Sequence, residues 1–196
     1  MKKNLKKIFR SETLRKKIYF TLGLVVIYKF LSVIPIPGVS SESLVALKDS
    51  LADQDGLLFF SSLMGGGLER FSIILMGLSP YINASIIIQL LAVVIPKLEE
   101  MKKEGQAGQK KITQLTRILT VPLAFAQSYG MILLLNSLTG IQLIDTANLF
   151  GAILPAMIIV TGGTILLMWL GELVNESGIG NGISLVIFAG VLAGVP

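Results

Sequence analysis

The chain contains no cysteine and no histidine, so it lacks most of the side chains that enzymes use for covalent and metal chemistry. Disulfides, thiol nucleophiles, zinc sites of the usual ligand types and Ser-His catalysis each need a residue that is absent. No glycine-rich phosphate-binding loop occurs, so ATP hydrolysis would have to take place on a partner. We therefore expect no metal, no cofactor and no enzymatic activity in this chain.

A few polar side chains interrupt the apolar stretches, and they suit hydrogen bonding better than proton chemistry. Asn83, Gln89 and Gln127 are uncharged amides, and bonds from such groups between membrane helices contribute about 0.6 to 2 kcal/mol. A solute transporter or an intramembrane aspartyl enzyme would need ionisable groups near mid-membrane. Lys29 is the one charge within the four complete apolar stretches, so both of these classes are disfavoured.

Long apolar helices must position these residues. The sequence is 53% hydrophobic and only 15% charged, whereas soluble domains have about 25% charged residues. The candidate spans, each suited to crossing about 30 Å of hydrocarbon, are residues 18–34, 71–95, 118–138 and 147–171. A last apolar run, 183–196, is too short for an ordinary span, and we expect the sequence to stop inside a fifth span. The fold class is therefore an all-α polytopic membrane protein.

The distribution of lysine and arginine predicts the orientation in the membrane. Residues 1–17 hold eight of the 17 Lys and Arg, and the loop 96–117 holds six more, which places both in the cytoplasm. The loop 35–56 has four acidic residues and one lysine, so we expect it outside, as we do the loop 139–146. The loop 172–182 should be cytoplasmic by alternation, although it has no Lys or Arg.

Three segments allow more than one interpretation from the residues alone. Residues 1–17 mix cations with apolar side chains, which fits either a helix in the membrane interface or a solvated basic tail. Residues 56–68 are apolar but too few to cross, so they form either a re-entrant element or an interfacial helix. Pro80 and the polar residues near it in the second span either join helices or line a water-filled path.

Four motifs resemble the SecY family of protein-conducting channels and occur in its order and spacing. They are IPIPG at 34–38, GLSPYINASIIIQLL at 77–91, KKEGQAGQKKITQLTR at 102–117 and LMWLGELVNESGIGNGISLVIFAG at 167–190. The resemblance covers essentially the whole chain. It implies the N-terminal half of a ten-span pseudo-symmetric clamshell with an hourglass pore.

The resemblance also implies roles for particular residues. The family's ring of bulky aliphatic side chains at the pore waist corresponds here to Leu78, Ile82, Ile183 and Ile187, although Leu78 departs from the usual isoleucine. Both pairs have the i, i+4 spacing that puts two residues on one helical face. Asn83, Gln89 and Gln127 are candidates for this half of the lateral gate, with ordinary packing as an alternative for Gln127.

The family's plug, a short helix that fills the outer funnel at rest, corresponds to residues 57–70, which favours the re-entrant interpretation. The plug residues are Leu57, Leu58, Phe59, Phe60, Ser61, Ser62, Leu63, Met64, Gly65, Gly66, Gly67, Leu68 and the bordering Arg70.

The implied function is passage of unfolded secretory polypeptides across the bacterial plasma membrane and lateral release of signal or transmembrane segments into lipid. The implied partners are the SecE and SecG subunits, the SecA ATPase or a ribosome, the translocating chain with its signal sequence, membrane lipid, and the complementary C-terminal half.

Overall fold

A computed structural model describes residues 12–52, 68, 70–140, 142–145, 148–177 and 181–194. The regular elements within these residues are helices, and one isolated β-bridge accompanies them. In chain order they are α2 (Glu12–Val33), α3 (Ser41–Ala52), α5 (Ser79–Val94), α6 (Pro96–Lys103), α7 (Gln106–Thr139), the π-helical turn η1 (Leu149–Ile153), α8 (Leu154–Ser177) and α9 (Gly182–Gly194).

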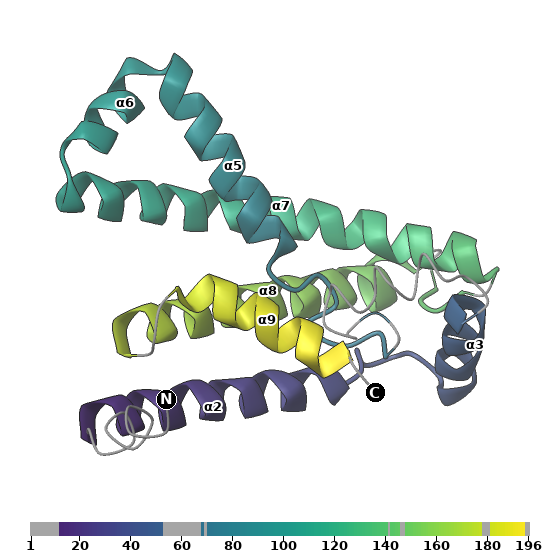
Figure 1. Cartoon of the computed structure of the whole chain (residues 1–196). Coiled ribbons are helices and arrows are strands. Elements are labelled where there is room, and N and C mark those ends of the chain that lie inside the picture. Colours follow the sequence, from purple (N-terminus) through teal and green to yellow (C-terminus); the bar gives the residue numbers. More distant parts are fainter. Residues whose placement is uncertain are drawn as a thin grey trace.

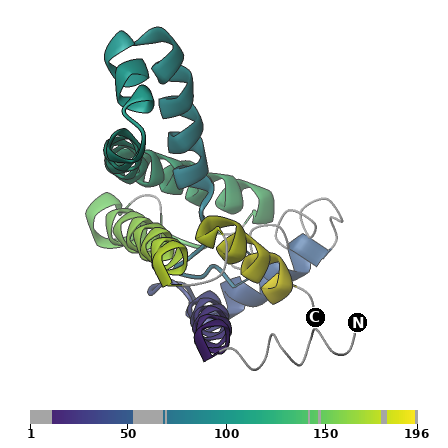
Figure 2. The ribbon, with the colours of Figure 1, turned by 60° about the vertical axis from the view of Figure 1, so that its left-hand side comes forward.

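Four helices form the body of the molecule. Helices α2, α8 and α9 pack on one another, and α7 packs along α8 (Figure 1). Helix α5 leans out from this body against α7, and α6 turns back so that α5, α6 and α7 form a triangle (Figures 1 and 2). We call the end of the body near α3 the α3 end, and the opposite end, near α6, the α6 end.

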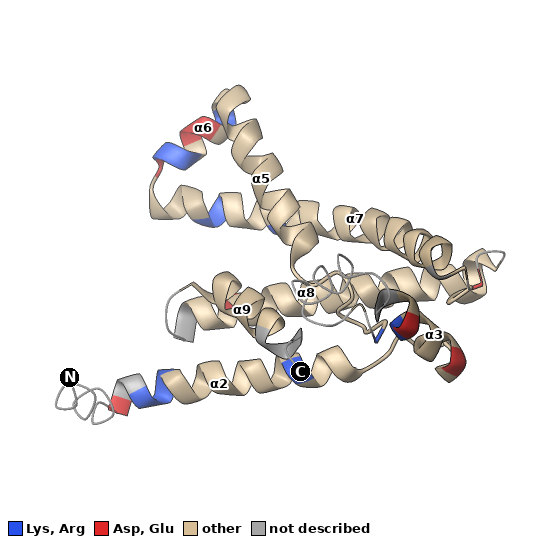
Figure 3. Ribbon diagram, turned by 45° about the vertical axis from the view of Figure 1, so that its right-hand side comes forward, with Lys and Arg blue, Asp and Glu red and all other residues tan. Residues whose placement is uncertain are grey.

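Two of the described helical stretches are long and apolar enough to cross a membrane, namely Gln106–Leu138 and Leu149–Asn175. Helices α5 and α6 meet that test only together, and they are bent by 104° at their junction. Charged residues are concentrated on α3, on α6 and at the start of α2 and α7, which leaves long uncharged stretches in α7 and α8 (Figure 3).

The helices differ in three places from the spans and loops expected from the sequence, and one of these is the loop 35–56, which contains α3. The run 71–95 reads as one span, but α5 begins only at Ser79, and residues 73–78 form turns. Phe71 and Gly77 have φ values of 46° and 54°, in the left-handed region, which interrupts a right-handed helix. The run 96–117 reads as a loop, but α6 and the first three turns of α7 occupy most of it.

Proline placement explains part of this difference. Pro80 lies in the first turn of α5, where a missing N–H is tolerated, rather than inside a span where it would free a carbonyl. Pro122, in contrast, lies inside α7. Because proline has no N–H, it cannot donate to the carbonyl one turn earlier, and one backbone hydrogen bond of α7 is missing there.

A short backbone pairing joins the end of α2 to the segment before α5. The Ile36 N–H donates to the Phe71 carbonyl at 2.9 Å, and the Ile73 N–H donates to the Ile34 carbonyl at 3.0 Å. These two bonds flank the antiparallel bridge between Pro35 and Ser72. Because the pairing satisfies polar backbone groups, a non-helical segment can lie inside an apolar protein.

Helix α8 packs directly against this pairing at Gly163. A Cβ added to Gly163 would collide with the Ile73 carbonyl oxygen, whereas a Cβ on the neighbouring Gly162 would meet nothing within 4 Å. The paired segments, α3, α7 and α8 contribute buried side chains to the core around the pairing, including Ile36, Leu47, Phe71, Ile132, Leu135 and Val160. Because α8 approaches the pairing closely, segments that are distant in the sequence share one buried core.

This packing yields a test of stability. Gly163→Ala should destabilise the fold by about 1 to 3 kcal/mol, because backbone must move to admit the methyl group. Gly162→Ala is the matched control and should be neutral or slightly stabilising, since alanine favours helix by about 1 kcal/mol over glycine. Denaturant-induced unfolding in detergent micelles measures both, and equal stabilities for the two variants would contradict the close approach.

Candidate functional site

An apolar cavity lies where the start of α5 meets α9 and α2. Its volume is about 160 Å³. It is lined by Tyr28, Met76, Gly77, Leu78, Ser79, Ile82, Val186, Ile187 and Gly190. Three of the four predicted ring residues, Leu78, Ile82 and Ile187, therefore lie together around one space although they come from segments about 100 residues apart.

The fourth predicted ring residue, Ile183, is not among the residues that line this cavity. Ile183, one turn earlier on α9, is half-buried and packs against the cluster of buried side chains that includes Leu167 and Val174. Exposure also separates the ring residues, since Leu78 is 5% exposed while Ile82 and Ile187 are 37% and 39% exposed. Ile82 and Ile187 are thus more exposed to solvent than Leu78 among the aliphatic side chains that line the cavity.

The backbone at the start of α5 positions two of the predicted ring residues, Leu78 and Ile82. Leu78 is the N-cap residue of α5, and its carbonyl accepts the first helical bond from the Ile82 N–H at 3.0 Å. Gly77 takes a left-handed conformation immediately before it, which glycine adopts without a Cβ clash. The ring residues of this side therefore lie where the turn segment becomes helix.

Asparagine side chains set the start of α9. The Asn181 Oδ1 accepts from the Ile183 N–H at 3.0 Å, and the Asn175 Oδ1 accepts from the Gly182 N–H at 2.6 Å. These bonds satisfy amide groups that the first turn of a helix leaves without partners. Sequence reasoning missed this role, although an asparagine directly before a helix is a usual capping signal.

Most of the predicted plug, residues 57–67, lies outside the described residues. Leu68 is 2% exposed and belongs to the core at the α3 end, and its carbonyl accepts from the Phe71 N–H at 3.2 Å. Arg70 is exposed. The segment after the predicted plug is thus tied into the core.

The three predicted gate residues occupy different surroundings. Gln89 is exposed, donates to the Ser85 hydroxyl at 3.0 Å, and lines a cavity of about 210 Å³ between α5 and α7. Asn83 is exposed and Gln127 is half-buried, and neither lines that cavity. The other residues lining it are Tyr81, Ser85, Ile88, Ala92, Lys102, Gln109, Ile112, Thr113 and Thr116.

Helix α6 closes the triangle with exposed charges. The Lys103 ammonium lies 2.6 Å from the Glu99 carboxylate. The hydrogen bond that it donates lowers the pKa of Glu99. Exposed pairs of this kind add little to stability, so α6 is held mainly by its covalent links and by close packing on α7.

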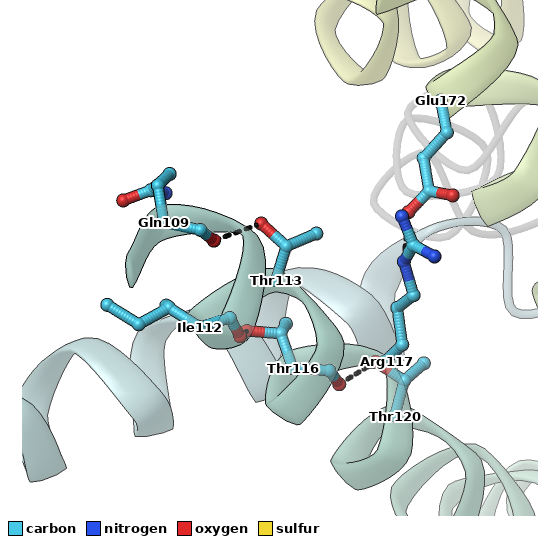
Figure 4. Close-up of polar contacts among 7 residues, drawn as sticks. All are labelled: Gln109, Ile112, Thr113, Thr116, Arg117, Thr120 and Glu172. Carbon is cyan, nitrogen blue, oxygen red and sulfur yellow. Dashed lines mark hydrogen bonds and ion pairs between the residues drawn. The ribbon is translucent and has the colours of Figure 1, made fainter. Parts of the chain in front are cut away.

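An ion pair that sequence reasoning missed connects two of the long helices. The guanidinium of Arg117 on α7 contacts the carboxylate of Glu172 on α8 (Figure 4). The two residues are 55 positions apart, and neither belongs to a periodic charge pattern that would have indicated the partner.

Comparisons with known proteins agree on one family. The SecY family model matches residues 72–196. The protein translocase subunit SecY of Corynebacterium glutamicum is 44% identical over 194 residues, which is 96% of this chain and 44% of that protein. The same subunit of Mycobacterium tuberculosis H37Rv is 42% identical over 195 residues, covering 95% of this chain and 44% of that protein. The chain thus spans less than half the length of these relatives.

A solved structure is similar in fold. Sec61 in the canine ribosome-channel complex from the endoplasmic reticulum superimposes with a TM-score of 0.57 at 22% identity, covering 91% of this chain and 36% of that one. The helical architecture of the described residues is thus similar to that of Sec61, and its apolar helices are consistent with a polytopic membrane protein. The family match over residues 72–196 shows that the chain belongs to the SecY family.

Proposed function

We propose that this chain supplies one wall of the pore and of the lateral gate of a channel that conducts unfolded polypeptides across a bacterial plasma membrane. The observation that carries the proposal is the cavity in which Leu78 and Ile82 meet Ile187. These are family ring positions, and they lie around a mostly apolar space between two helices.

An apolar constriction suits this task for two physical reasons. It offers no charge and few hydrogen bonds to a passing chain, so segments of any sequence can leave it again. A narrow apolar constriction also empties of water and thereby blocks ions when no polypeptide fills it. The channel is a passive pore, and the driving energy comes from a ribosome or from SecA.

The remaining elements take the family's roles in this proposal. Residues 57–70 act as the plug, and Asn83, Gln89 and Gln127 form this side of the lateral gate. Ile183, one turn before Ile187 on α9, is the fourth residue of the ring. The partners are SecE, SecG and the complementary half of the channel, and the ribosome named with the similar Sec61 structure supports a ribosome as one driving partner.

The ring assignment predicts a change in ion leak. Replacing both Ile82 and Ile187 with Ser in the intact channel should widen and wet the constriction. Fully burying one aliphatic side chain contributes about 1.5 to 3 kcal/mol to a closed state, and ~1.4 kcal/mol is a factor of ten. Resting conductance in planar bilayers should therefore rise by about tenfold or more, and precursors with weak signal sequences should pass better.

The chain offers matched controls on the same helices. Ile87 and Phe188 are 37% and 56% exposed, so each is at least about as accessible as Ile82 and Ile187, but neither lines the cavity. Serine at both of these positions should leave the resting conductance nearly unchanged. A leak in the control channel as large as that of the ring variant would assign Ile82 and Ile187 to ordinary packing.

The proposed orientation predicts which side of the membrane reaches each loop. A cysteine at Ser50 should react with a membrane-impermeant maleimide added outside cells, and one at Ala107 only after the cytoplasmic side is opened. Ala107 is exposed, whereas a side chain on the adjacent Gly108 would collide with the Met101 carbonyl. The chain has no cysteine of its own, so labelling is specific, and the reversed pattern would overturn the orientation.

A further inference from the structure

The Arg117–Glu172 ion pair is shielded at its point of contact. The Nε atom of Arg117 and the Oε1 atom of Glu172 are both buried from solvent, and they touch each other directly (Figure 4). The two side chains are unequal overall, because Arg117 is 43% exposed and Glu172 only 17%. The Glu172 side chain is thus mostly buried beside α8, whereas the Arg117 side chain extends from the contact toward the surface.

Both residues mark the same boundary along their helices. Arg117 is the last charged residue before the uncharged part of α7, and Glu172 is the first charged residue after the uncharged part of α8. The pair therefore lies at the edge of the hydrocarbon, where low dielectric strengthens attraction and makes a lone charge costly. Removing one partner of a shielded pair is much more disruptive than removing both.

Beyond this point toward the α6 end, α7 has open space on two sides. The cavity containing Gln89 separates it from α5. A second, wider cleft of about 430 Å³ follows another face of α7 and is lined by Gln106, Gln109, Lys110, Thr113, Gln114 and Arg117. Arg117 is the residue of this cleft nearest the uncharged part of α7.

A third helix converges on the pair. Tyr81 of α5 is 9% exposed and lines the cavity between α5 and α7 together with Thr116, the residue directly before Arg117. Tyr81 is followed directly by Ile82 and Asn83, the proposed ring and gate residues of α5. Any shift of α7 relative to α8 at this level therefore acts on the part of α5 that carries the site.

We propose that Arg117 and Glu172 are positioning residues that hold α7 against α8 and so hold α5 in the arrangement of the closed gate. This role rests on the proposed channel function. When the pair separates, α7 tilts away from α8 at the α6 end and carries α5 with it, which loosens the gate without changing any residue of the ring.

The test measures the separation of α7 from α8 in the intact channel assembly. Spin labels go on Gln114 and Trp169, which are exposed and precede Arg117 and Glu172 by three residues each. Glu172→Gln and Arg117→Gln should each lengthen and broaden the interlabel distance in lipid nanodiscs. Translocation of precursors with weak signal sequences should rise about fivefold, the ratio that corresponds to ~1 kcal/mol.

Three further variants separate positioning from a general loss of structure. The neutral double variant Arg117→Gln/Glu172→Gln leaves no lone charge at the contact, so it should lengthen the interlabel distance less than either single variant does. Arg117→Lys keeps the charge and should restore most of the wild-type distance. Lys110→Gln removes a cation of the same cleft and should change neither readout.

The outcomes distinguish this proposal from the channel function. Unchanged distances in both single variants and in the double variant, or equal effects of Lys110→Gln, would overturn the positioning role even if the channel translocates normally. A wild-type assembly that binds its partners but moves no polypeptide would refute the channel function, while the distances would still report whether the pair holds α7 to α8.

Discussion

The backbone pairing between residues 34–36 and 71–73 is the constraint on which the rest of this fold depends. Backbone groups that face lipid must be satisfied within their own helix, so an irregular segment can exist at membrane depth only inside protein. The pairing and the close approach of Gly163 bury such a segment between α2 and α8. Phe71, fully buried with a φ of 46°, is held in this strained conformation by the surrounding core.

The candidate ring follows from the same constraint. Because the chain leaves the pairing through turns and enters α5 only at Ser79, Leu78 and Ile82 lie at the junction between irregular and helical backbone. A continuous helix from residue 71 would lack the left-handed turn at Gly77 and would direct these side chains differently. The apolar cavity against α9 thus depends on a contact made several residues earlier in the chain.

The sequence predicts the elements that depend on local information. Uncharged runs locate the long apolar parts of α7 and α8, because charge and length decide whether a helix is apolar and long enough to cross a membrane. Helix α5 begins eight residues after the start of the predicted span, because the turns before it are stabilised by partners near residue 35. The pairing of Arg117 with Glu172 was missed for the same reason: it is decided by how two helices pack, which neither local pattern contains.

The two ends of the body are held by different forces, and this difference would leave the proposed gate free to move. At the α3 end, one buried cluster joins α3, α7 and α8, and Asn136 adds bonds to the Leu143 N–H at 2.9 Å and the Ile144 carbonyl at 3.1 Å. At the α6 end, α5 and α7 stand apart around a cavity, and a charged contact at the hydrocarbon edge links α7 to α8. Packed apolar surface resists displacement in every direction, whereas an ion pair can part and re-form as water reaches it. In the proposed channel, the motion that admits a polypeptide should therefore pivot at the α3 end and be largest at the α6 end.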